Sequence, residues 1–248
     1  MKFRLYCIFE SPENRTPQYS SPGEDLRVQA IKKHGLCAAF SEVPDEVPID
    51  AVSTLMMHHK TITYFFDRVT VIPFRFDTVL EDLSDLELLL KEKGDSYRQT
   101  LRRLDGCAEM GIRAIVGEEA AEPLSEAGCR DRHSPDASNP GLLYLRNRKI
   151  HYTGESRIAE RNEQVSAKFR TAFAGMFREF RSDASRLDVG SGDRGPFLIS
   201  LYFLVPKEFL MSFRHQFAAL AAMDSAKLLL SGPWPPYNFV LPKEPRLT

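Results

Sequence analysis

The segment from Ser231 to Val240 constrains the fold most, because it places the only tryptophan of the chain among three prolines. Each proline fixes φ and removes a backbone donor, and the residue before a proline is pushed toward extended geometry. We therefore expect neither a helix nor a ladder strand here, but a stiff, extended tail. Burying Trp234, Tyr237 and Phe239 at ~150 to 250 Å² each would contribute on the order of 10 kcal/mol before entropy and polar costs. Such a tail should cover its own core, clamp two domains or engage a partner, and spacing alone favours the first.

Composition excludes several classes of protein. The 33 basic and 34 acidic residues leave a formal net charge of −1, so no global field attracts nucleic acid or an anionic membrane. Residues 1–9 interleave charged and apolar side chains, unlike a signal peptide, and the longest apolar run, 197–206, is about half of the ~20 residues that a membrane span needs. Four widely spaced cysteines form no CxxC pair. We expect a cytoplasmic protein with reduced thiols and neither a nucleic-acid nor a membrane partner.

The first half of the chain reads as strand, hairpin, helix, strand, helix and strand. The expected elements are a strand at 2–9, a hairpin at 26–43 turning at His34-Gly35, a helix after Pro48, a strand at 69–76, a helix at 82–104 broken at Gly94, and a strand at 107–116. The first helix carries one apolar stripe that should face the core: Val52, Leu55, Met56, His59, Ile62 and Phe66. This order predicts an α+β domain in which helices cover one face of a mixed sheet.

The second half restarts after a linker-like run. Its expected elements are a short strand at 142–146, a helix at 156–180, strands at 187–189 and 197–205, a helix from Pro206, and a strand at 226–230. Both faces of the strand at 197–205 are apolar, so we expect it at a central position of its sheet. The order helix, strand, strand, helix, strand predicts a modified ferredoxin-like domain. We therefore predict an N-terminal domain at 1–125, a C-terminal domain at 126–231 and an extended tail at 232–248.

No residue pattern nominates a reaction. The GxGxxG match at 190–195 lacks the following helix that dinucleotide binding requires. His58 and His59 point about 100° apart on a helix, which disfavours a shared metal. We expect His59 on the apolar stripe with a local hydrogen bond, and His58 toward another element or solvent. Arg75 and Glu109 lie on expected strands and could form a catalytic pair, although a structural salt bridge is favoured. We predict no catalytic, cofactor-binding or metal-binding residue.

The run Gly232-Pro-Trp-Pro-Pro-Tyr237 after an apolar strand resembles the C-terminal signature of the gas vesicle protein F/L family (GvpF and GvpL). Further matches follow the family order along the chain: Leu36-Cys-Ala-Ala-Phe-Ser-Glu-Val43, His58-His59, Pro73-Phe-Arg-Phe-Asp-Thr78, Glu109, Gly141-Leu-Leu-Tyr-Leu145 and Leu204-Val-Pro206. Two positions depart from the family pattern, with Asp77 where glycine is usual and Asn238 where serine is frequent.

The resemblance implies a minor structural or accessory component of the gas vesicle, located at the vesicle in the cytoplasm, without enzymatic activity or cofactor. Its implied partner is the small hydrophobic shell subunit of the GvpA type, whose aggregation it would limit during assembly; other gas vesicle accessory proteins are further candidate partners. The candidate structural or interaction residues are Gly232, Pro233, Trp234, Pro235, Pro236, Tyr237, Phe239, Pro73, Arg75, Phe76 and Glu109.

Two alternatives from other classes stay open. An α+β protein of this size could bind a small ligand or catalyse a reaction on a sheet face or in a cleft between domains. An RNA-binding ferredoxin-like domain is weaker, because residues 197–205 are uniformly apolar and offer no aromatic platform with basic surroundings.

Overall fold

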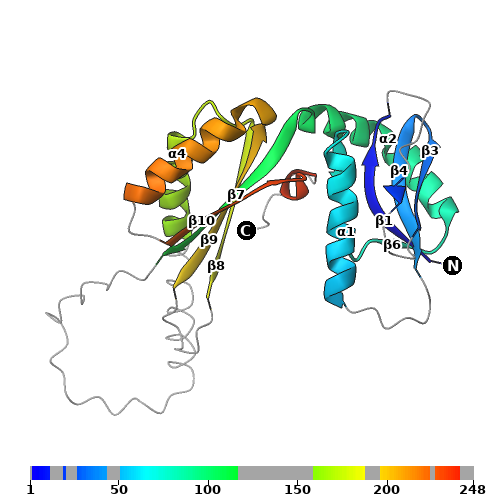
Figure 1. The fold of residues 1–248 in the computed structure, drawn as a ribbon, viewed down its shortest axis with the longest axis horizontal. Helices are drawn as coiled ribbons and strands as arrows, with labels where there is room; N and C mark the ends of the chain where they lie inside the picture. Colours follow the sequence, from blue (N-terminus) through cyan, green and yellow to red (C-terminus); the bar gives the residue numbers. More distant parts are fainter. Residues whose placement is uncertain are drawn as a thin grey trace, which may run out of the picture. The chain divides into compact units, whose positions relative to one another are not determined.

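The computed structural model describes residues 2–11, 19–20, 27–43, 51–116, 159–187, 196–223 and 227–240. Within these residues the chain forms a mixed α+β fold with two β-sheets and four α-helices (Figure 1). It divides into two compact units. The first contains Met1–Met110, Leu204–Leu210 and Gly232–Thr248, and the second contains Gly111–Phe203 and Met211–Ser231.

The first unit is built on a six-stranded sheet. Its strands are β1 (Lys2–Phe9), β2 (Tyr19–Ser20), β3 (Arg27–Lys33), β4 (Leu36–Val43), β5 (Val71–Pro73) and β6 (Val79–Leu80). The strand order is β2-β3-β4-β1-β5, and β6 also pairs with β1. The predicted hairpin is confirmed: β3 pairs antiparallel with β4, and both turn residues, His34 and Gly35, have positive φ. Two consecutive residues with positive φ suit the twist of a tight hairpin.

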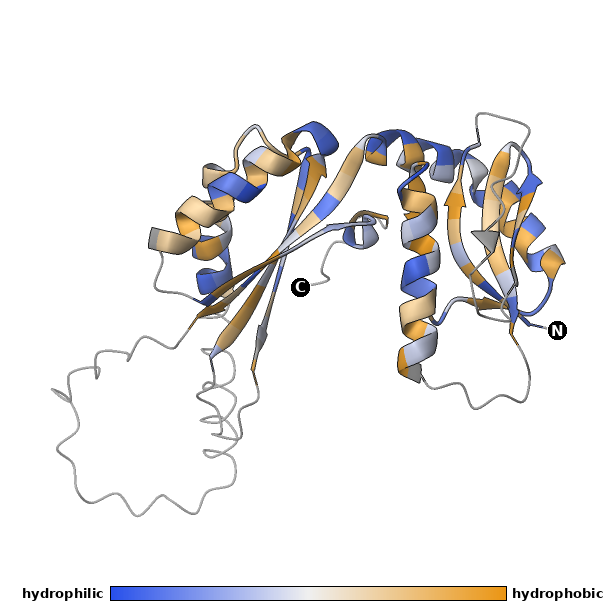
Figure 2. Cartoon of the chain, viewed as in Figure 1, coloured by the Kyte–Doolittle hydropathy of each residue, from blue (hydrophilic) through white to orange (hydrophobic). Residues whose placement is uncertain are grey.

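Helices α1 (Ala51–Phe66) and α2 (Leu83–Leu104) lie on opposite faces of this sheet (Figure 1). Cys7 and Ala39 are register partners that join the core cluster containing Phe65 of α1. Their neighbours Ile8 and Ala38, which point to the other face, are also fully buried. The prediction that helices cover one face only is therefore wrong. The cause is visible in Figure 2, where the central strands β1 and β4 are hydrophobic along most of their length.

The predicted core stripe of α1 is wrong over its first turns. Val52, Leu55 and Met56 are 64%, 52% and 57% exposed. The helix instead buries Thr54, His58, Thr61, Ile62, Phe65 and Phe66. Helical spacing identifies side chains that share a face, but the neighbouring aromatic groups around His58 decide which face turns inward.

Helix α2 runs without the break that we predicted at Gly94. Asp82 caps its first turn by accepting a hydrogen bond from the Asp85 backbone N–H at 3.0 Å. Gly94 is buried under the Arg98 side chain, whose guanidinium would lie 3.4 Å from an added Cβ. Glycine therefore leaves room for the Arg98 side chain at this position and does not end the helix. The Arg98 guanidinium also donates to the His34 carbonyl of the hairpin turn.

The second sheet has the order β10-β7-β9-β8, with β7 (Cys107–Val116), β8 (Glu179–Arg186), β9 (Phe197–Pro206) and β10 (Lys227–Trp234). The strand at 107–116 is confirmed, but it belongs to this sheet and not to the N-terminal one as predicted. Sequence spacing cannot choose the sheet that a strand joins. The predicted interior position of β9 is confirmed, because β7 and β8 flank it.

In the second unit, a helix at 159–172 and α4 (Leu210–Met223) lie on one side of this sheet (Figure 1). Phe173, just after the first helix, stacks on Phe213 of α4 with ring centroids 4.1 Å apart, and both rings contact Phe203 of β9. The predicted helix to residue 180 is too long, since Gly175 adopts positive φ and β8 begins at Glu179. The strand predicted at 187–189 is also wrong where described, because β8 ends before Leu187.

The proline-aromatic segment contains regular structure, contrary to our prediction. Strand β10 extends through Pro233 to Trp234, and Tyr237–Phe239 form a 3₁₀ turn, η2. Pro233 is tolerated because β10 is an edge strand, where a missing donor breaks no ladder. The predicted strand at 142–146 and the GxGxxG match at 190–195 lie outside the described residues, as does the boundary at 125. The ranges 1–125, 126–231 and 232–248 stay a prediction.

Candidate functional site

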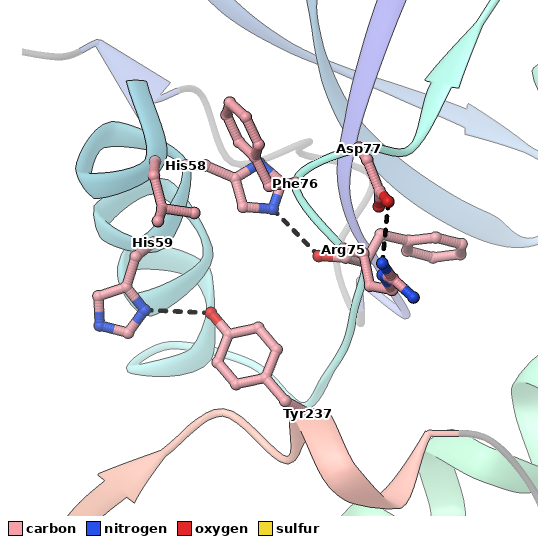
Figure 3. Close-up of a pocket in the computed structure, with 8 residues that line it drawn as sticks. His58, His59, Arg75, Phe76, Asp77 and Tyr237 are labelled. Atoms are coloured by element: carbon pink, nitrogen blue, oxygen red, sulfur yellow. Dashed lines mark hydrogen bonds and ion pairs between the residues drawn. The ribbon is translucent and has the colours of Figure 1, made fainter. Parts of the chain in front are cut away.

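The first unit contains a surface pocket of about 550 Å³ between α1, the loop after β5 and the turn η2. Its lining residues are Leu55, His58, His59, Phe74, Arg75, Phe76, Asp77 and Tyr237. Figure 3 shows how the two histidines project from adjacent positions of α1 while Tyr237 reaches them from the C-terminal segment. The pocket therefore brings the C-terminal signature to the paired histidines and the 73–78 motif, which lie more than 150 residues earlier in the sequence.

His58 holds the loop after β5 against α1. It is 4% exposed, and its Nε2–H donates to the Phe74 carbonyl at 3.0 Å (Figure 3). The imidazole lies between the rings of Tyr6 and Phe76, at centroid distances of 5.0 and 5.6 Å. Burial lowers the pKa of His58, so the ring is neutral near pH 7. The expectation that His58 faces another element is met, and its role here is to position the backbone.

His59 lies on the partly exposed side of α1 and contacts the C-terminal segment. Its Nδ1 and the Tyr237 hydroxyl are hydrogen bonded at 3.1 Å, and its ring lies 5.2 Å from the Trp234 ring. Burial raises the pKa of the Tyr237 phenol, so the hydroxyl keeps its proton. The local hydrogen bond expected for His59 is replaced by a contact over 178 residues of sequence.

Some side chains of the 73–78 motif are packed against β1, and others are exposed in the loop after β5. Pro73 is buried in β5, where it pairs with Cys7 of β1. The Phe76 ring packs under the Arg4 guanidinium at 4.4 Å. Arg75 follows β5 in an exposed loop and forms a 2.9 Å ion pair with Asp77. The structure thus gives Arg75 a partner on its own loop, instead of the Glu109 that we expected across one sheet.

Glu109 of β7 binds the turn η2 instead. It is 4% exposed; its Oε2 accepts from the Asn238 backbone N–H at 2.8 Å, and its Oε1 accepts from Asn238 Nδ2 at 2.6 Å. Arg103 of α2 donates to the carbonyl of Phe239 in the same turn at 2.5 Å. We call the contacts of Glu109 and Arg103 with η2 the C-terminal latch.

Gly232 brings the chain close enough for the latch to form. Its φ is +104°, and an added Cβ would lie 2.6 Å from the Glu109 carbonyl oxygen. The peptide bond to Pro233 is cis. Only glycine combines this backbone conformation with so close an approach to another strand.

The anchors of the segment differ from those that we expected. Phe239 is fully buried, and Pro235 and Pro236 are buried, whereas Trp234 is 39% exposed and Tyr237 is half-buried. The large aromatic residue that defines the sequence signature is thus partly free to contact something else. The fixed part of the segment is the turn that follows it.

Asn238 is the residue of this site that sequence reasoning missed. It was noted only as a departure from the family pattern, yet both of its nitrogens bind Glu109. The paired departure at Asp77 likewise has a partner, Arg75. A carboxylate between the apolar residues Ala108 and Met110 of a predicted strand was the available signal, because a buried carboxylate requires a donor from elsewhere in the chain.

The pocket offers mainly apolar and aromatic walls with few polar groups. Its His58 and Tyr237 side chains are neutral, and each already forms a hydrogen bond. Such a surface suits an apolar group better than a charged one. In the part of the chain that the structure describes, no three His, Cys, Asp or Glu side chains are grouped to hold a metal ion. No helix there is both long and apolar enough to cross a membrane.

The fold is that of known gas vesicle proteins. The chain superposes on the crystal structure of GvpF from Microcystis aeruginosa with a TM-score of 0.71 and 18% identity, covering 97% of this chain and 99% of that one. The GvpF structure from Anabaena sp. PCC7120 gives a TM-score of 0.68 at 18% identity, with 97% and 96% of the two chains covered. These likenesses establish the class of fold, a two-sheet α+β protein of the GvpF type.

Sequence comparison identifies the family. The family model described as gas vesicle synthesis protein GvpL/GvpF matches residues 4–241. Gas vesicle protein L of Streptomyces sp. (strain CB03234) is 28% identical over 230 residues, 84% of this chain and 82% of the relative. Gas vesicle protein F of the same strain is 27% identical over 254 residues, 97% of this chain and all of the relative. The chain belongs to the GvpL/GvpF family of gas vesicle proteins, as its sequence motifs indicated.

Proposed function

We propose that this protein is a minor, non-catalytic accessory component of gas vesicles that assists shell assembly. In this proposal it binds the small hydrophobic shell subunit, of the GvpA type, and limits its aggregation before the subunit joins the shell. The observation that carries the proposal is the family match, which extends from residue 4 to residue 241. The site of action is the gas vesicle in the cytoplasm.

The distribution of apolar side chains supports this role. Six large apolar side chains are more than half exposed among the described residues: Val52, Leu55, Met56, Leu88, Met211 and Leu229. Of these, Val52, Leu55 and Met56 share one face of α1, and exposed apolar side chains that gather on one face are typical of surfaces that meet another protein. A folded protein that carries such a face can cover the apolar surface of an aggregation-prone subunit. In the same proposal, the domain predicted at 126–231 is a modified ferredoxin-like domain, and residues 232–248 are its C-terminal tail.

Deletion and co-purification test the proposed function. Removing the gene from a vesicle-forming cell should abolish or deplete vesicles, and restoring the full chain should recover them. The tagged full chain should co-purify with the shell subunit and raise the fraction of that subunit that remains in the supernatant after centrifugation. Normal vesicles in the deletion strain together with no detectable association would refute the proposal.

The pocket of the first unit favours one second candidate, a small-ligand-binding function. Its volume of about 550 Å³ is sufficient for a small apolar or aromatic molecule. A ligand that binds only the folded chain would stabilise that chain by about 2.7 kcal/mol when the free ligand concentration is 100 times its Kd. A thermal-shift screen over metabolites, nucleotides and metal ions that shows no stabilisation would count against this candidate.

A further inference from the structure

The first turns of α1 are arranged opposite to the usual pattern of a surface helix. Val52, Leu55 and Met56 lie at i, i+3 and i+4 and therefore share one face, and all three are more than half exposed. On the inward face, Thr54 and His58 are 2% and 4% exposed. An amphipathic helix ordinarily buries its apolar face and exposes its polar one. We call the exposed residues Val52, Leu55 and Met56 the α1 stripe.

This arrangement is held in place by specific contacts. The inward face is fixed by His58, which donates to the Phe74 carbonyl and contacts the rings of Tyr6 and Phe76. Turning the stripe inward would break these contacts. The exposed position of the apolar side chains is therefore a property of the folded unit and not of a loosely attached helix.

The stripe continues into the pocket. Leu55 belongs to both, and His59, which follows it at i+4, lies in the pocket wall beside Tyr237. The partly exposed Trp234 ring contacts His59 at 5.2 Å and extends the same surface. At the end of the stripe, a partner would thus meet a pocket whose volume of about 550 Å³ has room for one of its side chains, as in helix-in-groove recognition.

Area and charge decide between possible occupants. Three side chains exposed by half or more present on the order of 300 Å² of apolar surface, well below the ~800 Å² per partner of a stable interface between folded proteins. A second copy of this chain is therefore disfavoured. The charges at the pocket rim, Arg75 and Asp77, neutralise each other in an ion pair, so an anionic partner is not attracted. A short, apolar, uncharged protein segment fits both observations.

We propose that the α1 stripe and the adjoining pocket are the docking surface for an apolar segment of the hydrophobic shell subunit, one of whose side chains fills the pocket. This inference rests on the proposed function and adds to it the surface that performs the binding. The shell subunit is the one partner in that function whose chemistry, a small hydrophobic protein, matches a surface of this size and neutrality.

Two charge substitutions test the surface. Val52→Glu and Met56→Glu place a carboxylate where the apolar segment would bury it, and we expect each to weaken binding of the shell subunit by at least about tenfold. Both positions are exposed, so the melting temperature should stay within about 2 °C of the unmodified chain. Met56→Leu, which keeps an apolar side chain, should retain binding.

Met211→Glu is the matched control. Met211 is 65% exposed on α4 in the other unit, so the same substitution is made at equal exposure on another helix. The full chain and each variant are tagged, co-expressed with the shell subunit and compared by the amount of subunit retained per chain. Loss in Val52→Glu and Met56→Glu with retention in Met211→Glu supports the docking surface.

The other outcomes are separable. Equal retention by all variants overturns the docking surface but leaves the proposed function intact. No retention by the unmodified chain overturns the proposed function itself. If the unmodified chain is a dimer in size-exclusion chromatography and Met56→Glu makes it monomeric, a second copy occupies the stripe and the proposed occupant is wrong.

Discussion

Removal of the Asn238 side chain should destabilise the first unit by about the free energy that the hydrogen bond between this side chain and Glu109 contributes. Asn238→Ala deletes the Nδ2 donor that lies 2.6 Å from Oε1 of a carboxyl group that is 4% exposed. The backbone N–H at 2.8 Å from Oε2 is retained. Hydrogen bonds to charged groups contribute about 1.5 to 3 kcal/mol each, and the Glu109 oxygen is too buried for water to replace the donor easily. We expect a loss of free energy of unfolding in that range.

This loss should lower the melting temperature by about 3 to 12 °C, because 1 kcal/mol shifts the midpoint by roughly 2 to 4 °C in a protein of this size. The assay is thermal unfolding of the full chain followed by circular dichroism. Gln99→Ala is the control, since it removes an amide from an exposed position of α2 and should change stability by less than about 0.5 kcal/mol. Asn238→Asp is nearly isosteric but sets two carboxyl groups against each other, so it should cost more than Asn238→Ala.

A double-mutant cycle isolates the pair. Glu109→Gln and Asn238→Ala are measured separately and together, and residues that share a buried hydrogen bond should show a coupling energy of about 1 kcal/mol or more. Additive effects, or equal melting temperatures for Asn238→Ala and Gln99→Ala, would refute the view that the C-terminal latch stabilises the first unit.

Three further perturbations follow from the structure. Gly232→Ala should lower the free energy of unfolding more than Gly106→Ala, because both positions have positive φ but only the Gly232 Cβ would meet a backbone oxygen, at 2.6 Å. The backbone strain at positive φ alone is about 1 to 2 kcal/mol for either alanine. Equal denaturant midpoints for the two variants would contradict the close approach at Gly232. Burial lowers the pKa of His58 below its ordinary value of 6.5, so the unfolded chain takes up a proton that the folded chain does not. The free energy of unfolding should therefore fall as the pH drops from about 7 toward about 5. In denaturant titrations at several pH values, His58→Gln should reduce this dependence of stability on pH. An unchanged pH dependence in the variant would contradict the assignment of the effect to His58. Phe239→Ala should cost about 3 to 5 kcal/mol and Trp234→Ala distinctly less, since the first ring is fully buried and the second is 39% exposed. Calorimetry that ranks them in the reverse order would show that the tryptophan is the anchor.

Local signals in the sequence predicted local structure well. His34-Gly35 indicated a tight hairpin turn because few residue pairs tolerate positive φ twice in succession, and both residues have it. The apolar character of both faces of residues 197–205 predicted a strand with neighbours on each side, which β9 has. In both cases the determining physics acts within a few residues.

Contacts between distant residues could not be predicted from spacing. The periodicity of α1 correctly grouped Val52, Leu55 and Met56 on one face, but only the position of Phe74, brought in by β5, shows that the opposite face is the buried one. Glu109 was recognised as a candidate, yet its partner lies 129 residues away. A buried carboxylate indicates that some hydrogen-bond donor must lie beside it, but the sequence does not identify that donor.

The family signature can now be divided by physical role. Gly232 permits the close approach, Phe239 fills the core, and Asn238 satisfies a buried carboxyl group, so these residues attach the C-terminal segment to the first unit. Trp234 and Tyr237 instead lie beside His59 at the edge of the pocket. Because the latch is made by the turn after Trp234, this ring stays partly exposed instead of being buried in the core. A signature that presents a preordered aromatic edge next to the exposed α1 stripe is what a docking surface requires, since ordering these groups in advance lowers the entropic cost of binding.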